Sequence, residues 1–357
     1  MKIALLGDVA LTGMFDCSQT NEVYERISAI KQLISDCDFA ICNLESPLTK
    51  RDNTFICKGA YIKSDPENIE VLKELGITHV TLANNHIFDY GKKGANETIS
   101  VLAKHHIQYC GLCDESLLLE KDEDKVLLDG FCCYSANGIY YGEKSMSTNL
   151  LCYDNLKRFL EKAKDKGCLP IASVHFGIEG LHYPAIEHIN LFHALADEFS
   201  YVLHGNHTHS IQGYEKYNNS LLIYSQGNLL FDDVLTTSIG SSIVQNDETR
   251  KTYIVKLEIS NNTIQNVHSH AVQFDESGYP HLSVEVEEEL QTYSEALAKH
   301  KDEISELRRS ERSQNIKKQE PKSIRFFVNR LNIKYIGAYI NGKLHARKYR
   351  AVFKPFY

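Results

Sequence analysis

Short apolar runs alternate with amphipathic helical patterns from the first residue to about residue 230, and this alternation limits the folds open to the chain. The apolar runs at 2–7, 38–45, 77–84 and 169–177 are short and have the composition of buried strands. Between the strands apolar side chains recur at helical spacing, as they do at 92–104. Alternating strands and helices are typical of layered α/β folds. We therefore predict an α/β fold with a layered β-sheet core flanked by helices.

Local turn signals mark several boundaries in this pattern. Asp65 followed by Pro66 is typical of a helix start with Asp65 as the N-cap, and Gly76 is the residue type that often ends a helix. Further along, two stretches of strand-like sequence flank Asn261 and Asn262. Paired asparagines of this kind favour a tight turn, so we predict a β-hairpin there.

Charge is distributed unevenly along the chain of 357 residues. The net charge is −8, but residues 301–357 carry 15 Lys and Arg against 5 Asp and Glu, which is a net charge of +10. The remaining 300 residues carry 24 basic and 42 acidic side chains, a net charge of −18. The two ends of the chain therefore differ in chemical character.

The composition changes near residue 275, and this change predicts two parts. Apolar residues at helical spacing over 286–307 predict one long charged helix, and the polar segment 313–323 is typical of an exposed linker. We predict a folded domain at 1–275. Residues 276–357 are expected to form a charged helix, a linker and a basic, aromatic helical appendage.

The sequence shows no recognisable export or membrane signal. The first apolar run, at 3–6, is shorter than the apolar region of a signal peptide, and no stretch approaches the roughly 18 apolar residues that span a bilayer. We expect a cytoplasmic protein that at most contacts the inner face of the membrane, with its ten cysteines kept as thiols.

Polar residues gather after five of the predicted strands. The clusters are Gly-Asp at 7–8, Asn-Leu-Glu at 43–45, the segment 83–91, His-Phe-Gly-Ile-Glu at 175–179 and Gly-Asn-His-Thr-His at 205–209. Loops at the carboxyl ends of strands form the ligand crevice of open α/β sheets. We therefore expect the five clusters to converge on one site.

The converging side chains include two carboxylates, amides and four imidazoles. Oxygen and nitrogen donors without thiolate suit Zn²⁺, Mn²⁺ or Fe, and the set is too large for one tetrahedral ion but suits two ions. Each residue alone has a plainer explanation: Asp8 could cap a turn, and His175 could be a core histidine. His207 and His209 are more informative, because alternate residues of an extended segment point to one side.

Six motifs, GDV, NLESPLT, LANNHIFDYG, VHFGIE, GNHTHSIQGYE and YSQGNLLFDD, occur together and in this order. Their order and spacing resemble those of the CapA family of poly-γ-glutamate capsule synthesis proteins, from residue 1 to about 235. The resemblance implies a fold similar to that of the calcineurin-like metallophosphoesterases. Proteins of this family are often membrane-anchored, whereas we expect no anchor in this chain.

The resemblance to the wider metallophosphoesterase pattern implies roles for individual residues. The residues that it places at one or two divalent transition metal ions are Asp8, Glu45, Asn85, His175, His207 and His209. Glu45 takes the place of the bridging carboxylate. The implied catalytic residues are His86, the acid at the leaving group, and Asp89, which with Glu179 would orient the histidines. Ala10 stands where that pattern usually has a ligand histidine, which could weaken the first metal, open a position for substrate or leave a single metal.

The resemblance implies a metal-dependent hydrolase or transferase acting in capsule or other cell-surface polymer biosynthesis, on an anionic polymer or its precursor. Two alternatives remain: a non-catalytic accessory subunit of a polymer-assembly complex with a degenerate metal site, and a phosphoesterase acting on a small phosphate ester. The basic tail could dock on an acidic polymer, on anionic lipid at a membrane surface, or on a polymer-synthesis complex. Nucleic acid is not an expected partner, because the rest of the chain is strongly acidic and shows no recognition motif.

Overall fold

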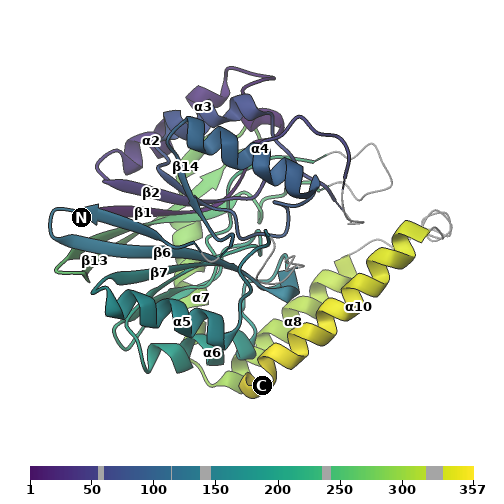
Figure 1. Ribbon diagram of the computed structural model, residues 1–357. Helices are drawn as coiled ribbons and strands as arrows, with labels where there is room; N and C mark the ends of the chain where they lie inside the picture. Colours follow the sequence, from purple (N-terminus) through teal and green to yellow (C-terminus); the bar gives the residue numbers. More distant parts are fainter. Residues whose placement is uncertain (55–59, 114, 137–145, 235–242, 319–332) are drawn as a thin grey trace.

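Two β-sheets lie face to face between helices in the computed structural model (Figure 1). One cluster of buried apolar side chains lies between the sheets, and a further cluster lies on the outer face of each sheet. This is a layered α/β fold, so the predicted fold class is confirmed. The structure describes residues 1–54, 60–113, 115–136, 146–234, 243–318 and 333–357.

The first sheet, over the described residues, has eight strands. They are β1 (Lys2–Ala10), β2 (Phe39–Leu44), β3 (His79–Thr81), β4 (Gln108–Cys110), β11 (Asn228–Phe231), β12 (Lys251–Ser260), β13 (Thr263–Phe274) and β14 (Pro280–Leu282). Their order is β14-β13-β12-β1-β2-β3-β4, and β11 pairs with β1 beside this path. Since β1 to β4 run parallel, their carboxyl ends meet at one edge of the sheet.

The second sheet contains six strands in the part of the chain that the structure describes. They are β5 (Leu117–Lys121), β6 (Asp124–Cys132), β7 (Leu169–His175), β8 (Val202–Asn206), β9 (Tyr214–Tyr217) and β10 (Ser220–Ile223). Their order is β5-β6-β7-β8-β10-β9, with β6, β7, β8 and β10 parallel. All seven residues of β7 are buried, as expected of a central strand that is covered on both faces.

Helices cover the outer faces of both sheets (Figure 1). Those of the first sheet are α1 (Val23–Arg26), α2 (Ser28–Ile34), α3 (Ile69–Leu75) and α4 (Gly91–Lys104), and those of the second are α5 (Tyr153–Asp165) and α6 (Ile186–Ala196). The C-terminal helices are α7 (Val284–Leu297), α8 (Lys301–Lys318) and α10 (Ile333–Phe353). Short 3-10 helices are η1 (Gly13–Phe15), η2 (Pro66–Asn68), η3 (Tyr134–Ala136) and η4 (Lys354–Phe356).

The predicted turn signals are confirmed. The carboxylate of Asp65 accepts a hydrogen bond from the backbone N–H of Glu67 at 2.9 Å, which caps η2 ahead of α3. Gly76 ends α3 with a φ of +87°, a conformation that glycine adopts without a steric cost. Asn261 and Asn262 have φ values of +54° and +57° and form the turn between β12 and β13.

The prediction of one long helix over 286–307 is wrong, because α7 ends at Leu297 and α8 begins at Lys301. Leu290 of α7 packs into the cluster between the sheets, whereas Ile304 of α8 packs into the outer cluster of the second sheet. One straight helix does not reach both clusters. The predicted linker at 313–323 is helical as far as Lys318, and its remaining residues lie outside the described ranges.

Helices α8 and α10 pack on the second sheet's side of the molecule and extend from it side by side (Figure 1). Phe353 of α10 is 1% exposed and lies in the same cluster as Phe192 of α6. Its ring is also 4.9 Å from the ring of His188. None of the helices that the structure describes is both long enough and apolar enough to cross a membrane. The division at residue 275 stays a prediction.

Candidate metal centre

Asp8 lies within β1, although the sequence predicted it directly after the strand. The pairing of β1 with β2 shifts by one residue between Leu5 and Asp8, which is a β-bulge. The shift exchanges the faces of the strand: Leu5 points between the sheets, but Val9 packs with the helices on the outer face. Asp8 is thereby turned away from those helices. Gly7 permits the bulge, because a Cβ there would be 2.1 Å from the carbonyl oxygen of Gly227.

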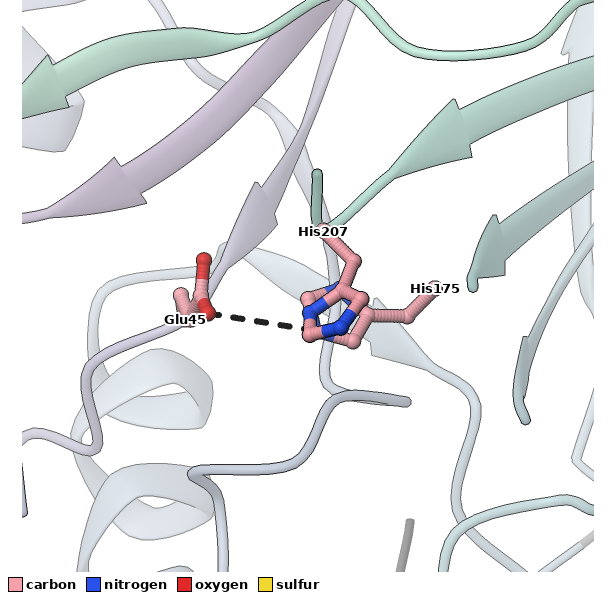
Figure 2. Close-up of side chains that lie close together, drawn as sticks. All are labelled: Glu45, His175 and His207. Atoms are coloured by element: carbon pink, nitrogen blue, oxygen red, sulfur yellow. Dashed lines mark ion pairs between the residues drawn. The ribbon is translucent and has the colours of Figure 1, made fainter. Parts of the chain in front are cut away.

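Glu45 follows β2 and is completely buried at the centre of the site. Its Oε1 atom lies 3.8 Å from His175 Nε2, 3.7 Å from His209 Nε2 and 3.9 Å from His86 Nε2. Figure 2 shows Glu45 facing the imidazoles of His175 and His207, which come from the ends of different strands. The two imidazole rings are 4.5 Å apart between centroids.

Three overlapping groups of side chains have ligand atoms within 4.8 Å of one another. The first is Glu45, His175 and His207, and the second is Asp8, Glu45 and His209. The third is Glu179, His207 and His209, of which Glu179 is exposed. Glu45 belongs to the first two groups, so one carboxylate lies between two sets of nitrogen and oxygen donors. This is the arrangement expected around two neighbouring cations.

Amide side chains hold Asp8 and His175 in place. The Nδ2 atom of Asn43 donates a hydrogen bond to Asp8 Oδ1 at 2.7 Å and lies 3.3 Å from His175 Nδ1. Asn84 in turn donates to Asn43 Oδ1 at 3.1 Å. The Oδ1 atom of Asn85 is 3.0 Å from His175 Nε2, so its amide oxygen faces the same donor group. The site residues from β1, β2, β7 and the loop after β3 are thus joined in one network.

The segment that carries His207 and His209 is not extended, so the expectation that both imidazoles point to one side of an extended segment is wrong. Both residues follow β8 and have positive φ values, +99° for His207 and +54° for His209. Conformations of this kind cost about 1–3 kcal/mol each in residues other than glycine and are concentrated at functional sites. The backbone N–H of His207 donates to Asp8 Oδ2 at 3.0 Å. The turn therefore places the backbone N–H of His207 and the imidazole of His209 beside Asp8.

Burial and mutual proximity shift the pKa values of the acidic and basic groups. Burial raises the pKa of Asp8, while His209 and the hydrogen bonds from Asn43 and His207 oppose that shift. Burial also disfavours the charged form of His209, but the carboxylates of Glu45, Asp8 and Glu179 outweigh it and raise the pKa of His209 to about 9. Carboxylates buried this closely attract positive charge. A bound divalent cation satisfies the same requirement as a proton on His209.

His86 and Asp89 form a pair at the rim of this donor set. The Nδ1 atom of His86 is 2.7 Å from Asp89 Oδ2, and Asp89 is fully buried. The same carboxylate oxygen accepts a hydrogen bond from the backbone N–H of Ile62 at 3.0 Å. The Oδ1 atom of Asn84 accepts from the backbone N–H of His86, which shapes the loop. Nε2 of His86 is therefore left on the side of Glu45.

The structure brings together every residue that the sequence assigned to the site, and it adds two. Asn43 contacts Asp8 and His175, and the Oδ1 atom of Asn228 lies 2.8 Å from His209 Nδ1. Both asparagines are within motifs quoted from the sequence, but no role was predicted for either. Asn43 lies near the end of β2 and Asn228 at the start of β11, and each is paired with Asp8 of β1. A position beside Asp8 is the feature that could have indicated their role.

Ala10 supplies no ligand atom. It is fully buried and packs in a small apolar cluster with Ile62 and Phe231. The ring of Phe231 is 5.1 Å from the ring of His209, so an apolar contact borders the second donor group.

The family model for bacterial capsule synthesis protein PGA_cap matches residues 2–233. The chain belongs to this family. It is 26% identical over 239 residues to the capsule biosynthesis protein CapA of Bacillus anthracis, an alignment that covers 63% of this chain and 57% of that protein. It is 27% identical over 218 residues to the PGA biosynthesis protein CapA of Bacillus subtilis, covering 58% of this chain and 57% of that protein. The chain thus spans a little over half the length of these curated relatives.

Among solved structures, the chain matches a putative 5'-nucleotidase from Staphylococcus aureus. The TM-score is 0.46 at 13% sequence identity, and the alignment covers 84% of this chain and 58% of that one. The family resemblance predicted from the motifs is confirmed by the PGA_cap match, which includes every predicted site residue.

Proposed function

We propose that this member of the PGA_cap family is a metal-dependent hydrolase or transferase that acts in capsule or other cell-surface polymer biosynthesis. The observation that supports catalysis is the position of Glu45 in two donor groups at once, one with His175 and His207 and one with Asp8 and His209. The polymer context rests on the family and on the names of the relatives, capsule biosynthesis protein and PGA biosynthesis protein.

The residues present fit one or two divalent transition ions such as Mn²⁺, Zn²⁺ or Fe²⁺, because oxygen and imidazole donors suit these metals. Asp8, Glu45 and His209 would hold one ion. Glu45, His175 and His207 would hold the other, with the amide oxygen of Asn85 beside them. When bound, such ions acidify a water molecule and polarise an oxygen of the substrate.

His86 is suited to protonate the group that leaves. Asp89 holds Nδ1 of His86 at 2.7 Å, and a doubly protonated imidazole held in this way would carry its second proton on Nε2. The proton on Nε2 is then on the side of Glu45, where the scissile bond would lie, while the proton on Nδ1 stays with Asp89. After transfer, His86 is neutral and keeps its orientation through the same hydrogen bond.

The test combines metal analysis with turnover of two substrates, an aryl phosphate and a γ-glutamyl amide. We expect the purified protein to contain one or two equivalents of transition metal, and His86→Ala to lower kcat by about 10²–10⁴ with unchanged metal content. His268→Ala, which removes an exposed imidazole on β13, is the matched control and should change neither quantity. Protein that takes up no metal, or a His86→Ala variant with full activity, would contradict the proposal.

A second candidate function is a non-catalytic accessory subunit of a polymer-assembly complex. Ala10 favours it, because the apolar contacts of this residue replace a donor that the wider metallophosphoesterase pattern supplies. This alternative predicts at most one equivalent of metal and no turnover of either substrate. Turnover of the aryl phosphate alone would instead favour a phosphoesterase acting on small esters.

A further inference from the structure

A cavity of about 990 Å³ lies between helices α8 and α10 and the body of the protein. Its walls come from α8 and α10, from the start of α6, from η3 and from the loop after β7. Helices α8 and α10 lie outside residues 2–233, the part of the chain that matches the family model. The volume is at the upper end of the range for ligand sites, which is about 300–1,000 Å³.

The lining of the cavity is strongly basic. Five cationic side chains line it: Arg308, Arg309, Arg312, Lys343 and Arg350. Glu187 is the acidic residue among the described lining residues, and it accepts a hydrogen bond from the hydroxyl of Tyr349 at 2.8 Å. Arg308 is half-buried, and its guanidinium donates to the carbonyl oxygen of Tyr183. The other four cationic residues are exposed, so their charges are available to a ligand in the cavity.

One residue that lines the cavity also carries a buried polar atom. His345 of α10 is 9% exposed, and its Nδ1 atom has no hydrogen-bond partner among the residues that the structure describes. Buried polar atoms without a partner are rare in folded proteins and cost free energy. A ligand that reaches this position would supply the partner.

The cavity is next to the candidate metal centre. Gly177 and Ile178 line it, and these two residues lie between His175 and Glu179, which both belong to the metal-binding groups. Helix α8 holds the same loop: Asn315 donates to the carbonyl oxygen of Gly180 at 2.8 Å. Glu311 accepts from the backbone N–H of His182 at 2.9 Å. One loop therefore borders both the cavity and the metal centre.

The spacing of the charges indicates the kind of ligand. Lys343 and Arg350 are seven residues apart on α10, which places their backbones about 10 Å apart along the helix. Arg308 and Arg312 add charges over about 6 Å of α8. A single phosphate requires donors that converge on one point. Charges spread over this length instead match a chain that carries a negative group on each of several units.

We propose that this cavity binds a polycarboxylate chain and presents it to the metal centre. The inference rests on the proposed function, and it assigns the substrate class to residues outside the part of the chain that matches the family. Planar guanidinium groups pair with carboxylates through two parallel hydrogen bonds, which suits the arginines of α8. The loop from His175 to Glu179 lies between the cavity that would hold the chain and the donor groups that would hold the ions.

The experiment measures binding of a fluorescent oligo-γ-glutamate of about ten units to the full chain. The variant Arg309→Gln, Arg312→Gln, Lys343→Gln removes three exposed charges from the cavity. Lys104→Gln, Lys166→Gln, Lys216→Gln removes three exposed charges elsewhere and is the matched control. We expect the dissociation constant to rise at least about tenfold in the first variant and less than about twofold in the second.

Equal binding by the two variants would overturn the proposal. It would also be wrong if inorganic phosphate, at the same concentration of charge, displaced the oligomer completely, or if vesicles of anionic lipid bound in a way that depends on the three residues while the oligomer did not bind. Metal content is measured on the same samples. Metal-free protein that still binds the oligomer through the cavity would contradict the proposed function alone, whereas metal-loaded protein without such binding would contradict only this inference.

Discussion

The candidate metal centre and the basic cavity share a loop but are built in different ways. At the metal centre, Asp8 and Glu45 are fully buried, and a β-bulge and a hydrogen bond from Asn43 at 2.7 Å fix the position of Asp8. In the cavity, Arg309, Arg312 and Lys343 are exposed on two helices, and their charge matters more than their exact placement. Metal binding at the centre is therefore expected to depend on exact geometry, whereas ligand binding in the cavity is expected to depend on electrostatic attraction. Changes of one atom should therefore affect the first far more than the second.

The largest effect is expected at Glu45. Glu45→Gln keeps the size of the side chain but removes the charge that both donor groups share. We expect metal affinity to fall by at least about 100-fold, since loss of partners that merely orient ligands already costs 10–100-fold. Elemental analysis after dialysis against a metal buffer measures this. Glu276→Gln, at an exposed position, is the control and should leave metal content unchanged. Equal metal content in the two variants would contradict the view that the metal centre depends on the exact placement of Glu45.

A smaller effect is expected when acid lowers the free energy of unfolding through His188, at the contact between α6 and α10. Burial, with a smaller contribution from Arg308, lowers the pKa of His188 to about 3, and Nε2 of His188 lies 3.1 Å from the hydroxyl of Tyr349 on α10. The folded state keeps His188 neutral, whereas the unfolded chain binds a proton below pH of about 6.5. Stability contributed by this group is therefore present above pH of about 6.5 and is lost as pH falls toward 3.

Urea unfolding of the parent and of His188→Gln at pH 6.5 and pH 5 checks this prediction. Each pH unit below the unfolded pKa costs about 1.4 kcal/mol per histidine, so the parent should lose roughly 2 kcal/mol more than the variant over this interval. Glutamine keeps a polar partner for Tyr349. Equal losses in the two proteins would show that His188 is protonated in the folded state.

The smallest effect is expected at Asn315, which ties α8 to the loop shared by the two regions. Asn315→Ala removes one hydrogen bond at a partly exposed position, and we expect a loss of stability of about 1 kcal/mol. Oligo-γ-glutamate binding should weaken a few-fold, with metal content unchanged. Ser313→Ala, on an exposed position of the same helix, serves as the comparison. A loss of metal in Asn315→Ala would show that the centre depends on helix α8 for its geometry.

Much of the fold could be predicted because its signals are local. Gly76, Asn261 and Asn262 need left-handed backbone conformations, and their residue types reveal this without any tertiary contact. The convergence of the five polar clusters could also be predicted, since parallel strands bring their carboxyl ends together.

The features that could not be predicted depend on contacts between distant segments. The bulge at Asp8 depends on the close approach of Gly7 to Gly227, and no pattern within residues 2–10 contains it. Similarly, Asn228 reaches His209 only because β11 pairs with β1. The cavity forms where α8 and α10 meet the loop after β7, so the charge of the tail was visible in the sequence but its position was not.

The loop between His175 and Glu179 has one more consequence, which concerns free energy rather than geometry. The loop lines the cavity and also carries donors of the metal centre. Binding of a polymer in the cavity that shifts this loop would therefore change the affinity of the centre for metal. Thermodynamic linkage makes the coupling reciprocal: the factor by which metal strengthens polymer binding equals the factor by which polymer strengthens metal binding. Metal supply and polymer supply would then act on this protein as mutual effectors.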